Sequence, residues 1–249
     1  MNKIVVFLSA VFFFAAFVAN AGDFVNPAVP DFLGTVIVEI DHKPTAVGSG
    51  FLIAAESGME FITAYHVIEM DDEDIIASSL KIFTKNMVVS IPRLSARKNP
   101  ESDLAHIPIS GKKGATAAHI TTPQVGETLT IFGTGQTEAS KFRGIAQSYY
   151  GHKPVWELWQ YGVPVRVVAT NVAGCEIIID LCKDQLRSIF HSGVQEFRYT
   201  KVKSLTQEMP HGFSGGPAVN QNGEVVGIYI GGFTYTNTDI LVPVSRGGQ

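Results

Sequence analysis

Short apolar or alternating runs, separated by residues that favour turns, recur along the chain from residue 35 to residue 244. No long amphipathic helix interrupts them convincingly. Many short strands at such spacing predict an all-β barrel or sandwich, and 249 residues suffice for one or two packed barrels. The predicted strands are residues 35–40, 46–53, 61–64, 80–84, 87–94, 104–109, 128–133, 141–148, 163–170, 196–199, 217–219, 224–230 and 239–244.

A glycine-rich stretch, MPHGFSGGPAV at residues 209–219, has neither helical nor strand periodicity. Glycines at 212, 215 and 216 surround Ser214, which predicts a tight, ordered turn whose backbone can approach a ligand closely. A serine hydroxyl becomes a useful nucleophile only when a neighbouring base takes its proton and a third group orients that base. A hydrolytic role for Ser214 therefore requires a suitable histidine and a suitable aspartate.

Two further segments supply these residues. The apolar, strand-like run FITAYHV at residues 61–67 carries His66 at its end. The segment SDLAHIPI at residues 102–109 places Asp103 before an alternating stretch that is suited to a strand or its lead-in. The chain order is therefore histidine, aspartate, serine.

Three motifs in that order resemble the trypsin and chymotrypsin superfamily of serine proteases. In that family a TAAHC-type stretch carries the base, a DLAL-type stretch carries the orienting acid, and GxSGGP carries the nucleophile. The resemblance implies two six-stranded antiparallel β-barrels with the active site in the cleft between them: residues 22–118 carrying His66 and Asp103, and residues 119–249 carrying Ser214. The matching positions are Thr63, Ala64 and His66; Asp103, Leu104 and Ala105; and Gly212, Ser214, Gly215, Gly216 and Pro217.

The same resemblance implies a serine endopeptidase that works through an acyl-enzyme. Ser214 attacks a peptide carbonyl, His66 transfers the proton, and Asp103 orients the imidazole. The backbone N–H groups of Gly212 and Ser214 hold the oxyanion. Two other functions share the motifs: a catalytically silent homologue that binds a peptide or a partner through the same cleft, and an esterase.

Chain order argues against two other classes of serine hydrolase. In α/β-hydrolases the histidine follows the serine, but none of the seven histidines follows Ser214. The subtilisin order needs an aspartate before the histidine. Asp41 satisfies that order, yet nothing around it supports the role, and two of the three motifs would stay unexplained.

Substrate-binding residues are predicted from family positions. Glu208, six residues before Ser214, falls where trypsin has the acid that recognises Lys or Arg. His211 and Tyr229 could equally line or fill the pocket. The strand after the serine, which includes Ile230 and Gly231, is predicted to bind the substrate backbone as an added β-strand.

Phe213 departs from the family pattern. Activated trypsins have an aspartate just before the serine, and it pairs with an N-terminal amine released by cleavage. A phenyl ring cannot form that ion pair, and no IVGG-like sequence lies near residue 22 or upstream of residue 35. We therefore predict that cleavage-triggered ordering of the oxyanion turn does not switch this protein on.

The first 21 residues are predicted to be a secretory signal peptide. Lys3 gives a positive start, residues 4–18 are apolar apart from Ser9, and Ala19-Asn20-Ala21 is a small-x-small cleavage site. A membrane anchor is the alternative, but the apolar run is shorter than the roughly 20 residues that a spanning helix needs. We expect cleavage before Gly22, a secreted or periplasmic protein, and no membrane association after cleavage.

Charge and composition bear on partners. The net charge is −4 at pH 7 with histidine neutral, and no basic cluster is present, which argues against nucleic acid. The expected substrate, a peptide or protein, is what the resemblance to serine proteases implies. No cofactor and no metal site are predicted. The acidic residues 71–74 could bind calcium through carboxylate oxygens, but they lack the spacing of a known loop, so a solvated turn is expected.

The pairing of the cysteines and the role of one aromatic segment stay open. Only Cys175 and Cys182 could form a disulfide. The isoleucine-rich run between them favours an extended strand that would separate them by roughly 23 Å. Pairing requires the segment to turn back so that the two Cα atoms lie within about 7 Å of each other.

The aromatic segment 149–162 is expected to be an insertion that packs on the second barrel, with an exosite or lid as the alternative.

Overall fold

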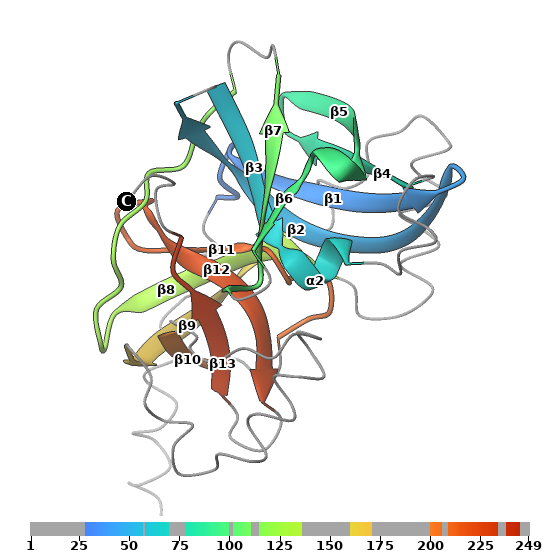
Figure 1. The fold of residues 1–249 in the computed structure, drawn as a ribbon. Helices are drawn as coiled ribbons and strands as arrows, with labels where there is room; N and C mark the ends of the chain where they lie inside the picture. The colour runs from blue at the N-terminus through green and yellow to red at the C-terminus, as the bar shows by residue number, and fades with distance from the viewer. Residues whose placement is uncertain are drawn as a thin grey trace, which may run out of the picture.

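The computed structural model describes residues 28–56, 58–69, 78–99, 102–110, 115–135, 160–170, 200–205, 209–233 and 238–244. Within these ranges the chain is almost entirely β-structure, arranged as two sheets that lie against each other (Figure 1). The predicted all-β, two-barrel fold class is confirmed. The strands expected at residues 141–148 and 196–199 lie outside the described residues.

The first sheet contains seven antiparallel strands in the order β5-β4-β1-β2-β3-β7-β6. The edge strand β6, which was not anticipated from the sequence, is short and pairs with β7. The elements are β1 (Leu33–Ile40), β2 (Lys43–Ala55), β3 (Gly58–Ala64), β4 (Ser78–Thr84), β5 (Met87–Pro92), β6 (Arg97–Asn99) and β7 (Leu104–Ile109), with the short helices α2 (Tyr65–Ile68) and η2 (Arg93–Ser95).

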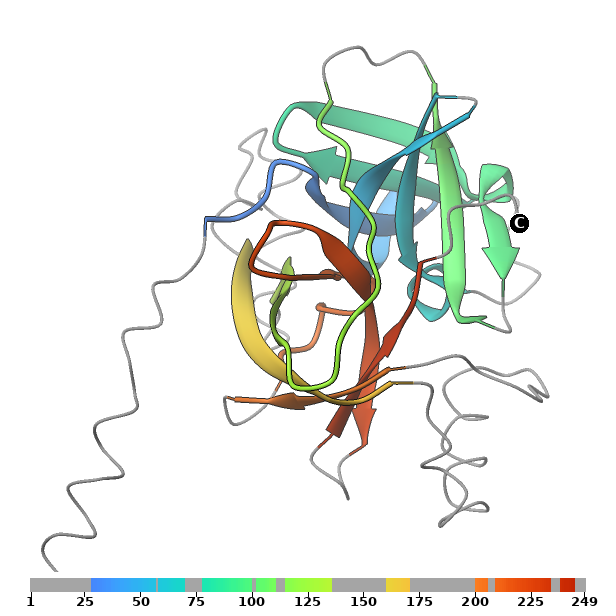
Figure 2. The ribbon, with the colours of Figure 1, turned by 90° about the vertical axis from the view of Figure 1, so that its left-hand side faces the viewer.

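The second sheet is a closed barrel of six strands in the order β10-β13-β12-β11-β8-β9. Figure 2 shows it below the first sheet, with β9 wrapping its outer side. Closure gives each strand a neighbour on both sides and so leaves no unpaired edge. Its strands are β8 (Thr128–Thr134), β9 (Gln160–Ala169), β10 (Thr200–Ser204), β11 (Pro217–Val219), β12 (Val225–Phe233) and β13 (Thr238–Val242).

Residues 115–121 connect the two sheets and touch both. Ala118 forms a parallel bridge with Ile53 of β2, and Ile120 forms one with Val225 of β12. Figure 2 shows this connector descending from the first sheet to the barrel. The predicted division between residues 118 and 119 falls inside this connector.

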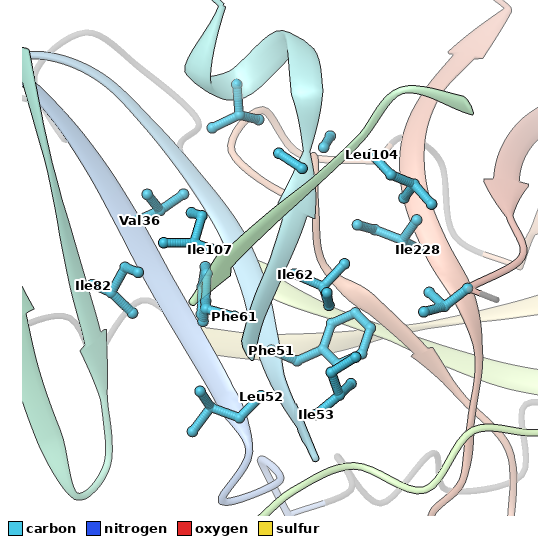
Figure 3. Close-up of a cluster of buried hydrophobic side chains, with 14 of the residues drawn as sticks. Val36, Phe51, Leu52, Ile53, Phe61, Ile62, Ile82, Leu104, Ile107 and Ile228 are labelled. Atoms are coloured by element: carbon cyan, nitrogen blue, oxygen red, sulfur yellow. The ribbon is translucent and has the colours of Figure 1, made fainter. Parts of the chain in front are cut away.

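The larger apolar cluster combines the interior of the first sheet with one face of the barrel. Figure 3 shows Ile228 of β12 near Leu104 and Ile62, which belong to the first sheet. Tyr229, the next residue of β12, belongs instead to a second cluster inside the barrel. Because successive side chains of a strand point to opposite faces, β12 can be apolar on both faces when one lines the barrel and the other lines the contact with the first sheet. No helix among the described residues is long and apolar enough to span a membrane.

Candidate active site

Asp103 and His66 are brought together by the pairing of β3 with β7. Ala64, the last residue of β3, lies opposite Leu104, the first residue of β7. Asp103 immediately precedes β7 and has a φ of 49°. This left-handed conformation, which aspartate tolerates better than most residues, lets the side chain and the backbone of Asp103 both face the start of α2.

Three hydrogen bonds tie Asp103 to the helix that carries His66. The imidazole Nδ1 lies 2.6 Å from Oδ2 of Asp103, and the backbone N–H of His66 donates to Oδ1 over 2.8 Å. The N–H of Tyr65 donates to the Asp103 carbonyl over 2.9 Å. Asp103 is fully buried, whereas the His66 side chain is 24% exposed. Since an ionised carboxylate only accepts, Nδ1 carries the proton and Nε2 is left as the acceptor.

These bonds also explain where β3 ends. The sequence predicted a strand over residues 61–64 inside a strand-like run that continues to Val67; β3 does end at Ala64, and His66 lies in the single turn α2, which the sequence did not predict. The N–H groups at the start of a helical turn have no partner within it, and here Asp103 accepts from two of them. Asp103 therefore orients the imidazole and stabilises the turn that holds it.

Ser214 lies in a turn that two glycines make possible. Gly212 has a φ of 90° and Gly215 a φ of 87°, which side-chain-bearing residues rarely adopt. The turn is anchored to β12 by hydrogen bonds from Gly215 N–H to the Tyr229 carbonyl (2.8 Å) and from Tyr229 N–H to the Gly216 carbonyl (2.9 Å). The predicted tight, ordered turn is what the structure contains.

The Ser214 turn is seated directly on the first sheet. The N–H of Ser49, in β2, donates to the Ser214 carbonyl over 2.8 Å. A side chain at Gly215 would collide with the Ser49 carbonyl and would lie 2.9 Å from the backbone nitrogen of Ala64. The turn thus lies against the end of β3, two residues before His66. No hydrogen bond joins the Ser214 hydroxyl to the His66 ring here, and such bonds are often long before substrate binds.

Two backbone N–H groups of the turn have no acceptor within the part of the chain that the structure describes. The carbonyls of Gly212, Phe213 and Ser214 accept hydrogen bonds from the Ser49 hydroxyl, Gly216 N–H and Ser49 N–H, respectively. Among the described residues, no acceptor is bound to the N–H of Gly212 or of Ser214. An oxyanion site needs pre-positioned donors of this kind, and the role of Gly212 and Ser214 as those donors stays a prediction.

The family model of the trypsin-like peptidase domain matches residues 48–228, more than half of the chain. The chain belongs to this trypsin-like peptidase family. Family membership confirms the resemblance that the three motifs suggested, and the two-sheet architecture is that of the family's serine proteases. No curated protein matches the chain in sequence.

Solved bacterial proteases share the fold. The active form of the Rv3671c protease from M. tuberculosis matches with a TM-score of 0.56 and 14% identity, over 89% of this chain and 81% of that one. The serine endoprotease from Yersinia pestis matches with a TM-score of 0.55 and 17% identity, over 86% of this chain. The match spans 59% of the Yersinia protein, which is less than two thirds of its length. At these identities the likeness is one of fold.

Phe213, where activated trypsins carry an aspartate, is anchored by apolar packing. Its side chain is fully buried in the cluster inside the barrel. The ring packs edge-on against Tyr161 of β9 with centroids 5.0 Å apart, and a Cβ at Gly133 would lie 2.7 Å from it. Tyr161 belongs to the aromatic segment 149–162, whose residues 149–159 lie outside the described residues. Sequence reasoning missed this pairing because nothing local links the two rings.

The predicted substrate-binding residues have different environments. His211 is exposed beside the turn, and Gly231, with a φ of 152°, is partly exposed on β12. Ile230 is buried in the larger cluster. Tyr229 is buried inside the barrel and its hydroxyl donates to Asp239 of β13 over 3.2 Å. Glu208 lies outside the described residues, as do Cys175, Cys182 and the acidic residues 71–74.

Asp239 is a partly buried carboxylate that sequence reasoning did not single out. Burial raises its pKa, and the hydrogen bond from Tyr229 opposes that rise. Burial, followed by the charge of Asp239, likewise raises the pKa of the Tyr229 phenol. The sequence signal that could have identified Asp239 is an aspartate within an otherwise apolar strand.

Among the described residues, no three His, Cys, Asp or Glu side chains gather as metal ligands.

Replacing Phe213 by Asp is expected to destabilise the fold. The carboxylate would enter an apolar cluster without a compensating partner, at a cost of about 3–5 kcal/mol. Phe213→Leu keeps the site apolar and should cost only about 1–2 kcal/mol. Urea denaturation of the two variants measures the difference. Equal stability of Phe213→Asp and Phe213→Leu would show that the position does not depend on apolar packing.

Asp239→Asn is expected to change how stability depends on pH. Because the pKa of Asp239 is raised in the folded state, its contribution is most favourable below the ordinary value of 3.8 and is lost as pH rises through the folded-state pKa. An amide does not titrate and can still accept from Tyr229. The variant should therefore gain stability over the wild type at pH 7 compared with pH 3.5. Denaturation at both pH values tests this, and a pH-independent difference would contradict it.

Proposed function

We propose that the protein is an exported serine endopeptidase in which Ser214, His66 and Asp103 form the catalytic triad. The observation that carries the proposal is the arrangement at the junction of the two sheets. A buried aspartate fixes one nitrogen of an accessible imidazole, and the neighbouring turn presents a serine and two N–H groups that bond no acceptor among the described residues. Family membership supports the same reaction class.

In the proposed mechanism the Ser214 Oγ attacks the carbonyl carbon of a peptide bond while Nε2 of His66 takes the hydroxyl proton. The carbonyl oxygen becomes an oxyanion that accepts from the N–H groups of Gly212 and Ser214. Asp103 stabilises the imidazolium, which then donates its proton to the leaving amine as the C–N bond breaks. Water, deprotonated by His66, hydrolyses the resulting acyl-enzyme and regenerates the Ser214 hydroxyl.

Labelling by a fluorescent fluorophosphonate tests this proposal. The purified protein is expected to become covalently labelled, because the probe reacts only with an activated serine. Ser214→Ala should abolish the signal, and Ser90→Ala, which removes an exposed hydroxyl on β5, should leave it unchanged. A folded protein that resists labelling would instead favour the silent, peptide-binding homologue.

Export is proposed on the sequence of residues 1–21, which lie outside the described residues. A short basic start, an apolar core and a small-residue cleavage site together form a secretory signal. Expressed in a bacterial host, the protein should accumulate in the periplasm or medium with an intact mass that corresponds to residues 22–249. Recovery of the unprocessed chain from the membrane fraction would support a retained anchor instead.

A further inference from the structure

Ser49 lies in a fully buried polar junction where the two sheets meet, formed by Thr35, Ser49, Thr63 and Thr134. Its hydroxyl lies 2.7 Å from the Gly212 carbonyl oxygen and 2.7 Å from the Thr134 backbone nitrogen. Its N–H donates to the Ser214 carbonyl, and its own carbonyl accepts from the Thr63 hydroxyl over 2.7 Å. One residue of β2 therefore contacts the Ser214 turn, β3 and β8.

The direction of the Ser49 hydroxyl follows from the donors around it. A backbone N–H can only donate, so the Ser49 oxygen accepts from Thr134. The single hydroxyl hydrogen is then left for the Gly212 carbonyl, which can only accept. The Ser49 hydroxyl is thus a donor to the Ser214 turn in one defined orientation.

We propose that Ser49 is a positioning residue for the reaction: by holding the carbonyls of Gly212 and Ser214, it fixes the two peptide groups on either side of the peptide that carries the Ser214 N–H, and so keeps that N–H directed at the oxyanion. The inference rests on the proposed function, because it concerns the same site. Ser49 touches neither the reacting atoms nor the imidazole, and it acts through the backbone of the turn.

The turn needs such a restraint because its conformation depends on glycine. Gly212, at a φ of 90°, has more accessible backbone conformations than any other residue type would have. The Gly212 carbonyl belongs to the peptide that joins Gly212 to Phe213, and the Ser214 carbonyl to the peptide that follows Ser214. Ser49 fixes both, one through its side chain and one through its backbone. Without the hydroxyl, the peptide at Gly212 loses the partner that sets its orientation.

Thr35 offers a matched control within the same junction. Its hydroxyl pairs with that of Thr134 at 2.5 Å and accepts from Gln160, but it forms no bond to the Ser214 turn. Thr35→Val removes that hydroxyl at nearly constant shape. It should lower stability, because a buried polar group of Thr134 loses its partner, while the Gly212 carbonyl remains held.

The test compares Ser49→Ala with Thr35→Val by the second-order rate of fluorophosphonate labelling. In that reaction the Ser214 Oγ–phosphorus bond forms, fluoride leaves, the hydroxyl proton passes to His66, and the phosphoryl oxygen occupies the oxyanion site. Loss of one oxyanion donor typically lowers kcat by 10²–10³-fold, so displaced donors should slow labelling by about 10–100-fold in Ser49→Ala. Thr35→Val should label within about twofold of the wild type, although both variants melt at lower temperature.

Steady-state kinetics supply a second measurement that a purely structural role would not move. On the peptide that the wild type cleaves best in a diverse library, Ser49→Ala should lower kcat and kcat/KM by the same factor and leave KM unchanged. That pattern marks an interaction made only in the transition state. If Ser49→Ala does not fold, Ser49→Cys, whose thiol is a weak donor of similar size, is judged by the same criteria.

The outcomes separate the two proposals. A Ser49 variant that folds and labels as fast as Thr35→Val, or that loses kcat/KM through KM alone, would overturn the positioning role and leave the endopeptidase intact. A wild-type protein that is not labelled at all would overturn the proposed function and this inference with it.

Discussion

The seating of the Ser214 turn on β2 is the contact on which the rest of the site depends. The proposed nucleophile and the imidazole come from different sheets, so their separation is set by how the sheets dock. Apolar side chains such as Ile228 and Leu104 bring the sheets together but give no orientation. The bonds from Ser49 to Ser214 and Gly212 are directional, and they fix the position of the turn against the end of β3.

Two buried polar residues near this junction serve the turn and the imidazole, namely Ser49 and Asp103. A buried carboxylate is costly unless it is bonded, and Asp103 meets that requirement through the ring and the first N–H groups of α2. The same bonds that offset the burial of Asp103 also orient His66. Fold stability and the geometry of the proposed base therefore share one set of interactions, which makes the site intolerant of a slipped β3–β7 register.

Phe213 shows that the same turn of a family fold can be ordered by apolar packing in place of an ion pair. Where activated trypsins use an ion pair, this chain uses a ring buried against Tyr161 and Gly133. Apolar burial does not depend on a new chain terminus, so the turn is held in place in the intact chain. Gly133 belongs to this arrangement, because a side chain there would occupy the space of the Phe213 ring.

Local sequence was enough to predict most of the described strands, though not β6 or β10, together with the glycine turn and the order of His66, Asp103 and Ser214. Turn residues and apolar periodicity act over a few residues, and the family motifs carry the three functional groups within short strings. The roles of Ser49, Tyr161 and Asp239 could not be read in the same way. Each depends on a partner more than nine residues away, and the docking of two sheets or the pairing of two strands decides which residues meet. The helical turn α2 after β3 has the same origin, because Asp103, far along the chain, accepts from its first two N–H groups.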